Sequence, residues 1–483
     1  MFLFFMAFCV FAWAQRVEIP INSQWRFAYY GSSAGAGAES VSFNDSAWGT
    51  VDLPHTWNAL DGQDGGSNYA RGFGWYRRHI TIGREYEGKR IYLFFESVGK
   101  KADVYCNGQP AGTHLGAYAA FCFDITNLVV LDADNVIAVR ADNANTSSVS
   151  PLNIIPQSGD FNQWGGICRT VRLVITEPVH ISPLDYASPG VYLTPTNVSR
   201  ASADLSIKVL VRNTAPLGQT ARIRATVLDA DNIPVDTLQT DQILPQDSTQ
   251  AVMLNTVISR PHLWNGRADP YLYKVIAEVE VNGIVTDGVE QPLGFRYFSV
   301  HPDAGFFLNG QYLDLHGVAM HEDRQNKGRA ISDADRQQDI ELMLEMGCNW
   351  IRPSHYQHAE TFYDLCDAKG IIVSSEIPIV NSITIGSADF DNNCKDQLRE
   401  LIRQNYNHPS ICFWLLYNEL TTSGSENLIG QLHELAHHED PVRLTTVAHN
   451  NTSDTAPWSY LTDTLAYNRY MGWYGGTPQG FVV

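Results

Sequence analysis

An uninterrupted apolar run, Ile411 to Tyr417, constrains the fold of this chain more than any other stretch. It reads I-C-F-W-L-L-Y and is followed directly by Asn418 and Glu419. Such a run suits a strand that is buried on both faces of a parallel sheet. In a barrel of parallel strands, catalytic groups lie at the carboxyl ends of the strands, because the connecting loops meet there. Asn418 and Glu419 are therefore either catalytic groups or the cap and first-turn acid of the next helix.

Strand and helix patterns alternate throughout residues 301–483. One helical pattern starts at Ser332 and stops at Gly347, another stops at Gly370, and a short apolar strand follows each. Alternating units of this kind form a parallel sheet covered by helices, and their number indicates a (β/α)8 TIM barrel.

The strand count predicts how much of that barrel is present. With residues 312–316 taken as the first strand, the apolar run is the fourth and residues 465–468 are the sixth. A complete barrel has eight strands. We therefore expect an incomplete TIM barrel of about six strands that lacks its last two βα units.

Two all-β segments precede the barrel, so the chain is multidomain. Residues 15–179 contain short alternating runs separated by turn residues, and Asn107-Gly108 is a strong hairpin signal. We expect a jelly-roll β-sandwich there. Residues 180–300 add about seven strands, with clear alternation over 205–211, which is typical of an immunoglobulin-like β-sandwich without a disulfide.

Residues 1–14 are apolar and end in Ala12-Trp13-Ala14, a pattern that resembles a signal peptidase site. We expect a signal peptide and a secreted or periplasmic protein, the alternative being a buried strand or a membrane anchor. No later stretch has the roughly 18 apolar residues of a spanning helix, so no membrane span is expected after the leader is removed.

The net charge argues against a nucleic-acid-binding protein, and the cysteine spacing argues against a cysteine metal site. The formal net charge of -19 argues against nucleic acid as a partner, because phosphate binding requires a basic face. Of the eight cysteines, Cys9 falls in the leader, and the other seven show no metal-ligand spacing. They are typical of small buried hydrophobic residues, although a single bridge between Cys106 and Cys122 stays open.

His433 to His437 read H-E-L-A-H, an H-E-x-x-H spacing that can hold zinc on a helix. The surrounding apolar residues predict the buried stripe of an outer barrel helix, which turns the two histidines to solvent, and no third ligand is placed. We therefore expect a structural helix, and no metal or cofactor anywhere in the chain.

Polar residues follow every predicted barrel strand: His316 and 321–323, 352–356, Glu376, 418–419, 449–450 and 468–470. Together they would place acids, imidazoles and amides on one rim, where a polyhydroxylated ligand could bind. Aromatic candidates for stacking on a sugar ring are Trp414, Tyr470, Trp473 and Tyr474.

Several long motifs resemble glycoside hydrolase family 2. In the barrel they are H-G-V-A-M-H-E-D-R (316–324), N-W-I-R-P-S-H-Y-Q-H (349–358), the run ending in N-E-L, and N-R-Y-M-G-W-Y (468–474). D-L-P-H-T-W-N (52–58) and G-G-I-C-R (165–169) resemble the jelly-roll sugar-binding domain of the family, and P-H-L-W-N-G-R-A-D-P-Y-L-Y (261–273) resembles its immunoglobulin-like domain. The resemblance covers essentially the whole mature chain.

The resemblance implies a retaining, exo-acting β-glycoside hydrolase that acts on terminal β-linked oligosaccharides or glycoconjugates, with Glu419 as general acid/base. β-Galactosidase is the first expectation, and β-glucuronidase and β-mannosidase are alternatives. A non-catalytic carbohydrate-binding module is the alternative of another class. The nucleophile would follow strand seven, so the printed chain is expected to be inactive. A homo-oligomer stays open.

The resemblance also assigns binding residues. Asn418 matches an amide that binds the sugar 2-hydroxyl, and His321 and His355 match histidines that line the pocket, each with a structural histidine as its alternative. Tyr470 matches a tyrosine beside the nucleophile. Asp160 matches a jelly-roll acid that reaches the pocket in some members.

Arg352 and Trp473 complete the candidate substrate-binding set, from their places at the rim. Glu376, after strand three, is expected to support the site through hydrogen bonds and not to act as nucleophile. Magnesium ligands of some family members fall near Val380 and Ser382 here, which removes that metal site.

Overall fold

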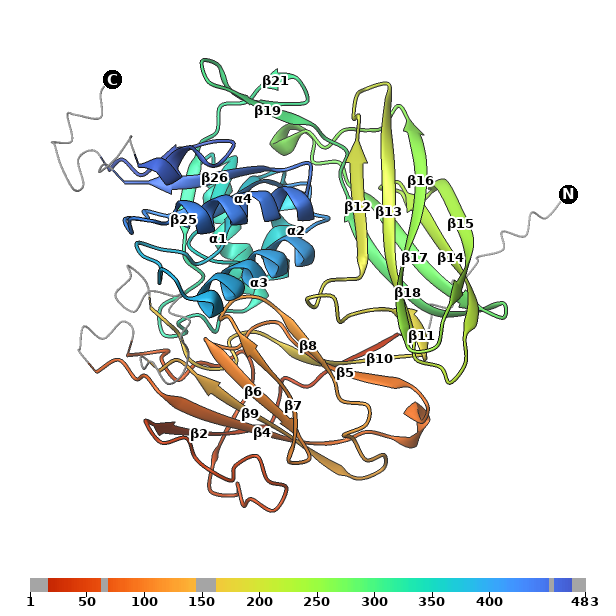
Figure 1. Cartoon of the computed structure of the whole chain (residues 1–483), viewed down its shortest axis with the longest axis vertical. Helices are drawn as coiled ribbons and strands as arrows, with labels where there is room; N and C mark the ends of the chain where they lie inside the picture. Colours follow the sequence, from red (N-terminus) through yellow and green to blue (C-terminus); the bar gives the residue numbers. More distant parts are fainter. Residues whose placement is uncertain (1–15, 62–67, 145–161, 451–455, 471–483) are drawn as a thin grey trace, which may run out of the picture.

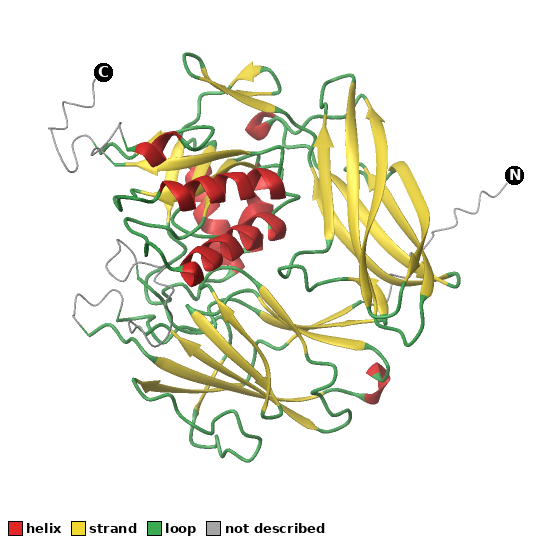
Figure 2. Cartoon of the chain, viewed as in Figure 1, coloured by secondary structure: helices red, strands yellow, loops and turns green. Residues whose placement is uncertain are grey.

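The computed structural model describes residues 16–61, 68–144, 162–450 and 456–470. Three domains follow one another along the chain and pack together (Figure 1). Two consist of β-strands, and the long helices all lie in the third (Figure 2). The expected order of two sandwiches followed by βα units is confirmed. The expected signal peptide, residues 1–14, lies outside the described residues.

The N-terminal domain is a jelly-roll sandwich of two antiparallel sheets, with strand orders β1-β10-β5-β8 and β3-β2-β4-β9-β6-β7. Asn107 and Gly108 have φ of 51° and 77° and connect β6 to β7, as the turn signal predicts. The elements are β1 (Val17–Pro20), β2 (Trp25–Gly31), β3 (Gly49–Val51), β4 (Phe73–Thr81), η1 (Arg84–Tyr86), β5 (Arg90–Phe95), β6 (Lys101–Cys106), β7 (Gln109–Leu115), β8 (Phe121–Asp124), β9 (Asp134–Asp142) and β10 (Val171–Thr176).

The second domain is an immunoglobulin-like sandwich. One sheet joins β11, β13, β12 and β16, and the other has the order β15-β14-β17-β18. Leu205, Ile207, Val209 and Val211 are all buried on one face of β13, as their alternation predicts. The strands are β11 (Val179–Ile181), β12 (Val191–Thr196), β13 (Ser202–Asn213), β14 (Gln219–Leu228), β15 (Pro234–Leu244), β16 (Ser248–Ser259), β17 (Tyr273–Val281) and β18 (Ile284–Leu293), and η2 is Gly266–Ala268.

The third domain is a curved sheet of parallel strands in chain order, β22-β23-β24-β25-β26-β27, with helices between them. This is the arrangement of an incomplete TIM barrel. Its elements are β22 (Gly317–Met320), α1 (Asp333–Glu345), β23 (Trp350–Pro353), α2 (Glu360–Lys369), β24 (Ile372–Glu376), α3 (Ala388–Gln404), β25 (Ile411–Asn418), α4 (Glu426–Glu439), β26 (Leu444–His449), η3 (Pro457–Tyr460) and β27 (Ala466–Tyr467).

The predicted first strand, 312–316, is wrong. Three short antiparallel strands, β19 (Phe298–His301), β20 (Gly305–Leu308) and β21 (Gln311–Tyr312), precede the barrel, and Tyr312 pairs with Phe307. Asn309-Gly310, with φ of 52° and 75°, forms the hairpin turn between β20 and β21. The first barrel strand is β22, which begins at Gly317 and pairs with β23 in parallel.

Every residue of β25 is buried, as predicted for the apolar run. Helix α4 begins only at Glu426, so Asn418 and Glu419 do not cap it, and that alternative is wrong. All seven cysteines in the described residues carry free thiols, which rules out the bridge between Cys106 and Cys122. Among the described residues, no helix combines the length and apolar character needed to cross a bilayer.

Candidate active site

The carboxyl ends of the parallel barrel strands bring the candidate residues together. Arg352 lies within β23, Glu376 ends β24, Asn418 ends β25, and Asn468 directly follows β27. β23, β24 and β25 are consecutive neighbours in the sheet, and β27 lies two strands beyond β25. This explains why residues more than a hundred positions apart form one connected network.

Arg352 lies at the centre of this network. Its Nη2 donates to Oε2 of Glu376 at 2.9 Å and to Oδ1 of Asn418 at 2.8 Å. Its Nη1 donates to Oδ1 of Asn468 at 3.2 Å. The side chain is buried, so its charge requires these acceptors. Arg352 therefore holds groups from three other strand ends in fixed positions.

Glu376 is fully buried and accepts on both oxygens. In addition to Arg352, Nδ1 of His355 donates to Oε1 of Glu376 at 2.8 Å, because a carboxylate oxygen can only accept. Burial alone would raise the pKa of Glu376, but the charges of Arg352 and His355 outweigh it and leave the pKa below its ordinary value. Glu376 is thus favoured in its ionised form and holds Arg352 and His355 through hydrogen bonds, the supporting role expected for it.

Glu419 follows the last residue of β25 and is half-buried. Nδ2 of Asn468 donates to its Oε1 at 2.7 Å, and its backbone N–H donates to the carbonyl of Ala448 in the next strand at 2.7 Å. Its φ of 52° lies in the left-handed region, which costs a non-glycine residue about 1 to 3 kcal/mol. Such strain is typical of functional positions, and here it sets where the carboxylate lies.

Asn418 is buried, and its amide orientation is fixed. Oδ1 accepts from Nη2 of Arg352 at 2.8 Å and from Nδ2 of Asn468 at 2.9 Å. An oxygen that accepts from two donors identifies the other end of the amide as nitrogen. The Nδ2 donor of Asn418 is therefore available to a ligand hydroxyl beside Glu419.

The two predicted histidines lie side by side at the rim. The rings of His321 and His355 are 5.4 Å apart at 74°, and Nδ1 of His321 is 3.2 Å from the hydroxyl of Tyr356. Tyr356 stacks on Tyr118 of the jelly-roll domain, with ring centroids 3.9 Å apart. The N-terminal domain thus supports the wall of the candidate site.

A buried ion cluster lies directly behind His321. The carboxylate of Glu322, 1% exposed, accepts from Arg169 at 2.7 Å, from Arg329 at 3.1 Å and from Arg336 at 2.9 Å. Burial alone would raise the pKa of Glu322, but the three guanidinium groups hold it well below its usual range. Arg169 belongs to the jelly-roll domain, so this cluster joins two domains.

The remaining candidates have different outcomes. Tyr470 lies two residues after Asn468 and is 48% exposed. Asp160, Trp473 and Tyr474 lie outside the described residues. The prediction that Trp414 stacks on a sugar ring is wrong, because its side chain is fully buried and its Nε1 donates to Asp440 at 2.9 Å.

Two residues that hold the candidate site together are not singled out by the sequence patterns. Asn468 was noted only as one member of a polar cluster, and Glu322 had no role assigned. The position of Asn468 directly after a short strand, like Glu419 after β25, is the signal that could have singled it out.

Three family models match consecutive segments of the chain. They are described as Glycosyl hydrolases family 2, sugar binding domain, at residues 19–178, Glycosyl hydrolases family 2 at residues 180–296, and Glycosyl hydrolases family 2, TIM barrel domain, at residues 300–480. This chain belongs to glycosyl hydrolase family 2. The family 2 resemblance inferred from the motifs is thereby confirmed, and the chain is a member of a family of glycosidases.

Relatives of this family 2 chain carry two kinds of name. A β-glucuronidase of Bacteroides fragilis is 42% identical over 99% of the chain, which spans 67% of that protein. A β-galactosidase of Bacteroides ovatus is 29% identical over 85% of the chain, which spans 47% of that protein. The crystal structure of a Bacteroides uniformis β-glucuronidase matches with a TM-score of 0.91 and 35% identity, covering 97% of this chain and 56% of that one. The chain therefore spans about half to two thirds of the length of these relatives.

Proposed function

We propose that this protein is a retaining, exo-acting β-glucuronidase in which Glu419 is the general acid/base. The observation that carries the proposal is the position of Glu419, a half-buried carboxylate at the end of β25 whose Oε1 is held by Asn468. The names of the relatives favour glucuronides over the galactosides that were expected first. β-Galactoside and β-mannoside hydrolysis are the competing outcomes of the test.

The geometry supports proton transfer by Glu419. In a retaining mechanism this carboxyl protonates the departing glycosidic oxygen and later removes a proton from the attacking water. Because Oε1 accepts the hydrogen bond from Asn468, the transferable proton belongs on Oε2. The same contact keeps the carboxyl group from rotating between the two steps.

Asn418 would bind the sugar next to the reacting bond. Its Nδ2 donor can meet the 2-hydroxyl, a contact that strengthens as positive charge develops on the sugar ring. Arg352 and Asn468 hold the amide in the required orientation. His321 and His355 are proposed to line the same pocket, and Tyr470 to lie at its edge.

A retaining glycosidase needs a second carboxylate about 5 to 5.5 Å from the first. Glu376 is not proposed for that role, since both of its oxygens already accept from Arg352 and His355. From the family resemblance, we propose that the nucleophile follows the seventh barrel strand. No described residue is assigned to it.

The test is a comparison of substrates with the complete gene product, including any residues encoded after Val483. We expect the highest kcat/KM for p-nitrophenyl β-glucuronide, followed by the β-galactoside and the β-mannoside. A higher kcat/KM for either rival would replace the glucuronidase assignment. Sugar binding without hydrolysis of any of the three would favour a binding module.

The role of Glu419 has its own test. Glu419→Gln should lower kcat/KM for the p-nitrophenyl substrate by about a hundredfold or more. The loss should be much smaller for a dinitrophenyl glycoside, whose leaving group needs little protonation. Glu434→Gln, at an exposed position of α4, is the matched control. Equal losses on both leaving groups would remove the acid/base assignment.

We also propose that the protein is exported, from the apolar segment 1–14 and its small-x-small end. Cell fractionation should find it outside the cytoplasm, and N-terminal sequencing should find Gln15 as the first residue. A cytoplasmic protein that retains Met1 would contradict the proposal.

A further inference from the structure

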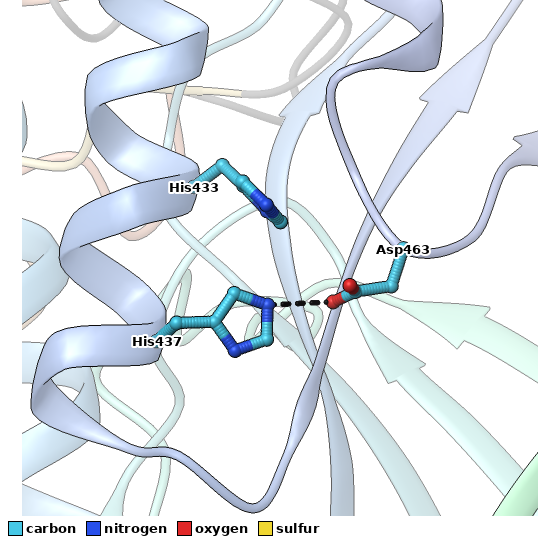
Figure 3. A group of neighbouring side chains, drawn as sticks. All are labelled: His433, His437 and Asp463. Atoms are coloured by element: carbon cyan, nitrogen blue, oxygen red, sulfur yellow. Dashed lines mark hydrogen bonds and ion pairs between the residues drawn. The ribbon is translucent and has the colours of Figure 1, made fainter.

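A second group of polar side chains lies between helix α4 and the segment before β27 (Figure 3). His433 and His437 are one turn apart on α4, with ring centroids 4.7 Å apart, and Asp463 reaches them from the segment before β27. One nitrogen of each imidazole and one oxygen of Asp463 lie within 4.8 Å of one another. The expectation that both histidines point to solvent with no third ligand is therefore wrong.

Hydrogen bonding fixes the tautomer of His433. The hydroxyl of Thr445 is 2.9 Å from Oδ2 of Asp463 and must donate its hydrogen there, because a carboxylate only accepts. The same hydroxyl oxygen lies 2.9 Å from Nδ1 of His433, so Nδ1 is the donor in that contact. Nε2 of His433 then carries a lone pair. A metal-binding histidine is typically held in this way by an oxygen acceptor on its other nitrogen.

Asp463 is held in place by the same residue. Its Oδ2 accepts from the backbone N–H of Thr445 at 2.7 Å and from Nε2–H of His437 at 2.9 Å, so metal binding at that nitrogen would release its proton to solvent. Asp463 is exposed and both imidazoles are half-exposed, so an ion and a completing water can reach the group from solvent. The three ligands are therefore oriented by the fold and accessible.

We propose that His433, His437 and Asp463 form a binding site for a first-row transition-metal ion, with Zn²⁺ as the best fit. Two imidazoles and one carboxylate are a ligand set suited to Zn²⁺ and unlike the all-oxygen sets of Ca²⁺ and Mg²⁺. A fourth position would be occupied by water. Metal–ligand distances of about 2.0 to 2.2 Å require the three side chains to move slightly closer together.

The bound ion would join two parts of the barrel. His433 and His437 lie on α4, whereas Asp463 lies in the segment between η3 and β27. That segment continues directly into Asn468, which holds Glu419. An ion that binds the folded state alone raises its stability, so the site would stabilise the segment that carries Asn468.

The experiment uses the 483-residue chain without a polyhistidine tag, after a chelator has removed bound metal. Titration calorimetry with ZnCl₂ should show saturable binding of one equivalent, and Zn²⁺ should raise the melting temperature. With Co²⁺ the protein should show the visible absorption of a low-symmetry N/O site. His433→Gln and His437→Asn should each weaken Zn²⁺ binding by at least about tenfold.

His438→Asn is the matched control, because His438 is an exposed histidine on the same helix. It should leave Zn²⁺ binding unchanged. Circular dichroism shows whether each variant is folded. If His433→Gln is unfolded, the affinity of His437→Asn for Zn²⁺ and the Co²⁺ spectrum of the parent chain test the site instead. Absence of saturable binding, or equal affinity in the parent chain and His437→Asn, would overturn the site.

Discussion

Asn468 donates from one amide nitrogen to two residues of another strand end, to Oε1 of Glu419 at 2.7 Å and to Oδ1 of Asn418 at 2.9 Å. Both hydrogens of Nδ2 are therefore used. Asn468, which follows β27, thus holds both Asn418, the last residue of β25, and Glu419, the residue after it. The carboxylate proposed to transfer the proton and the amide proposed to bind the sugar consequently depend on one side chain.

Asn468→Ala should lower the kcat/KM of the complete enzyme by about ten- to a hundredfold, because it removes a hydrogen bond to a charged group worth about 1.5 to 3 kcal/mol. The measurement is p-nitrophenyl glycoside hydrolysis. Asn255→Ala, at an exposed position of the immunoglobulin-like domain, should leave kcat/KM unchanged. An unaltered kcat/KM in Asn468→Ala would show that the contact does not position Glu419.

Glu376→Gln should lower the free energy of unfolding by about 3 kcal/mol, because it leaves the buried charge of Arg352 without its carboxylate. Urea denaturation of the printed chain measures the effect. Glu434→Gln, an exposed change on α4, should shift the free energy of unfolding by no more than about 0.5 kcal/mol. Equal midpoints for the two variants would contradict the central role of the pair.

The depressed pKa of Glu322 predicts a specific pH dependence. A carboxyl group whose pKa is lower in the folded state stabilises the fold above its unfolded pKa, here about 4.5, and loses that contribution as the pH falls through the folded value. Glu322→Gln should thus be clearly less stable than the parent at about pH 7, and the difference should narrow below about pH 4.5. Urea unfolding at several pH values checks this, and a constant difference would refute it.

Gly370 and Gly347 form a matched pair of left-handed glycines, with φ of 73° and 89°. A Cβ at Gly370 would lie 2.2 Å from the backbone of Gly266, whereas a Cβ at Gly347 would meet nothing within 4 Å. Gly347→Ala should cost about 1 kcal/mol from backbone strain alone. Gly370→Ala should cost clearly more than Gly347→Ala in the same denaturation experiment, and equal costs would show that the close approach relaxes freely.

Sequence patterns predicted the features that depend on residues close together in the chain, such as the burial of a strand or the end of a helix. The run at β25 is apolar on both faces, so its burial follows from its composition, and Gly370 ends α2 because only a left-handed residue suits that position. The barrel strand predicted at residues 312–316 was wrong because a short run that alternates apolar and polar residues does not reveal which strand it pairs with. The hairpin turn at Asn309-Gly310 was the better signal.

Contacts between distant segments could not be predicted in the same way. Trp414 and Asn418 lie on the same strand, yet one is enclosed against Asp440 and the other faces the site, which depends on how the barrel curves. Asp463 lies 26 residues from His437 in sequence, and only the parallel pairing of β26 with β27 brings it to α4.

The ion cluster at Glu322 has a consequence for the order of folding. Arg329 of the barrel also donates to the carbonyl of Ala117 at 2.7 Å and to the hydroxyl of Ser97 at 2.9 Å, both in the jelly-roll domain. The loop that carries His321 is therefore completed by atoms supplied from an earlier part of the chain. Because N-terminal domains generally fold first during synthesis, we expect these jelly-roll atoms to be in place before the loop that carries His321 folds against them.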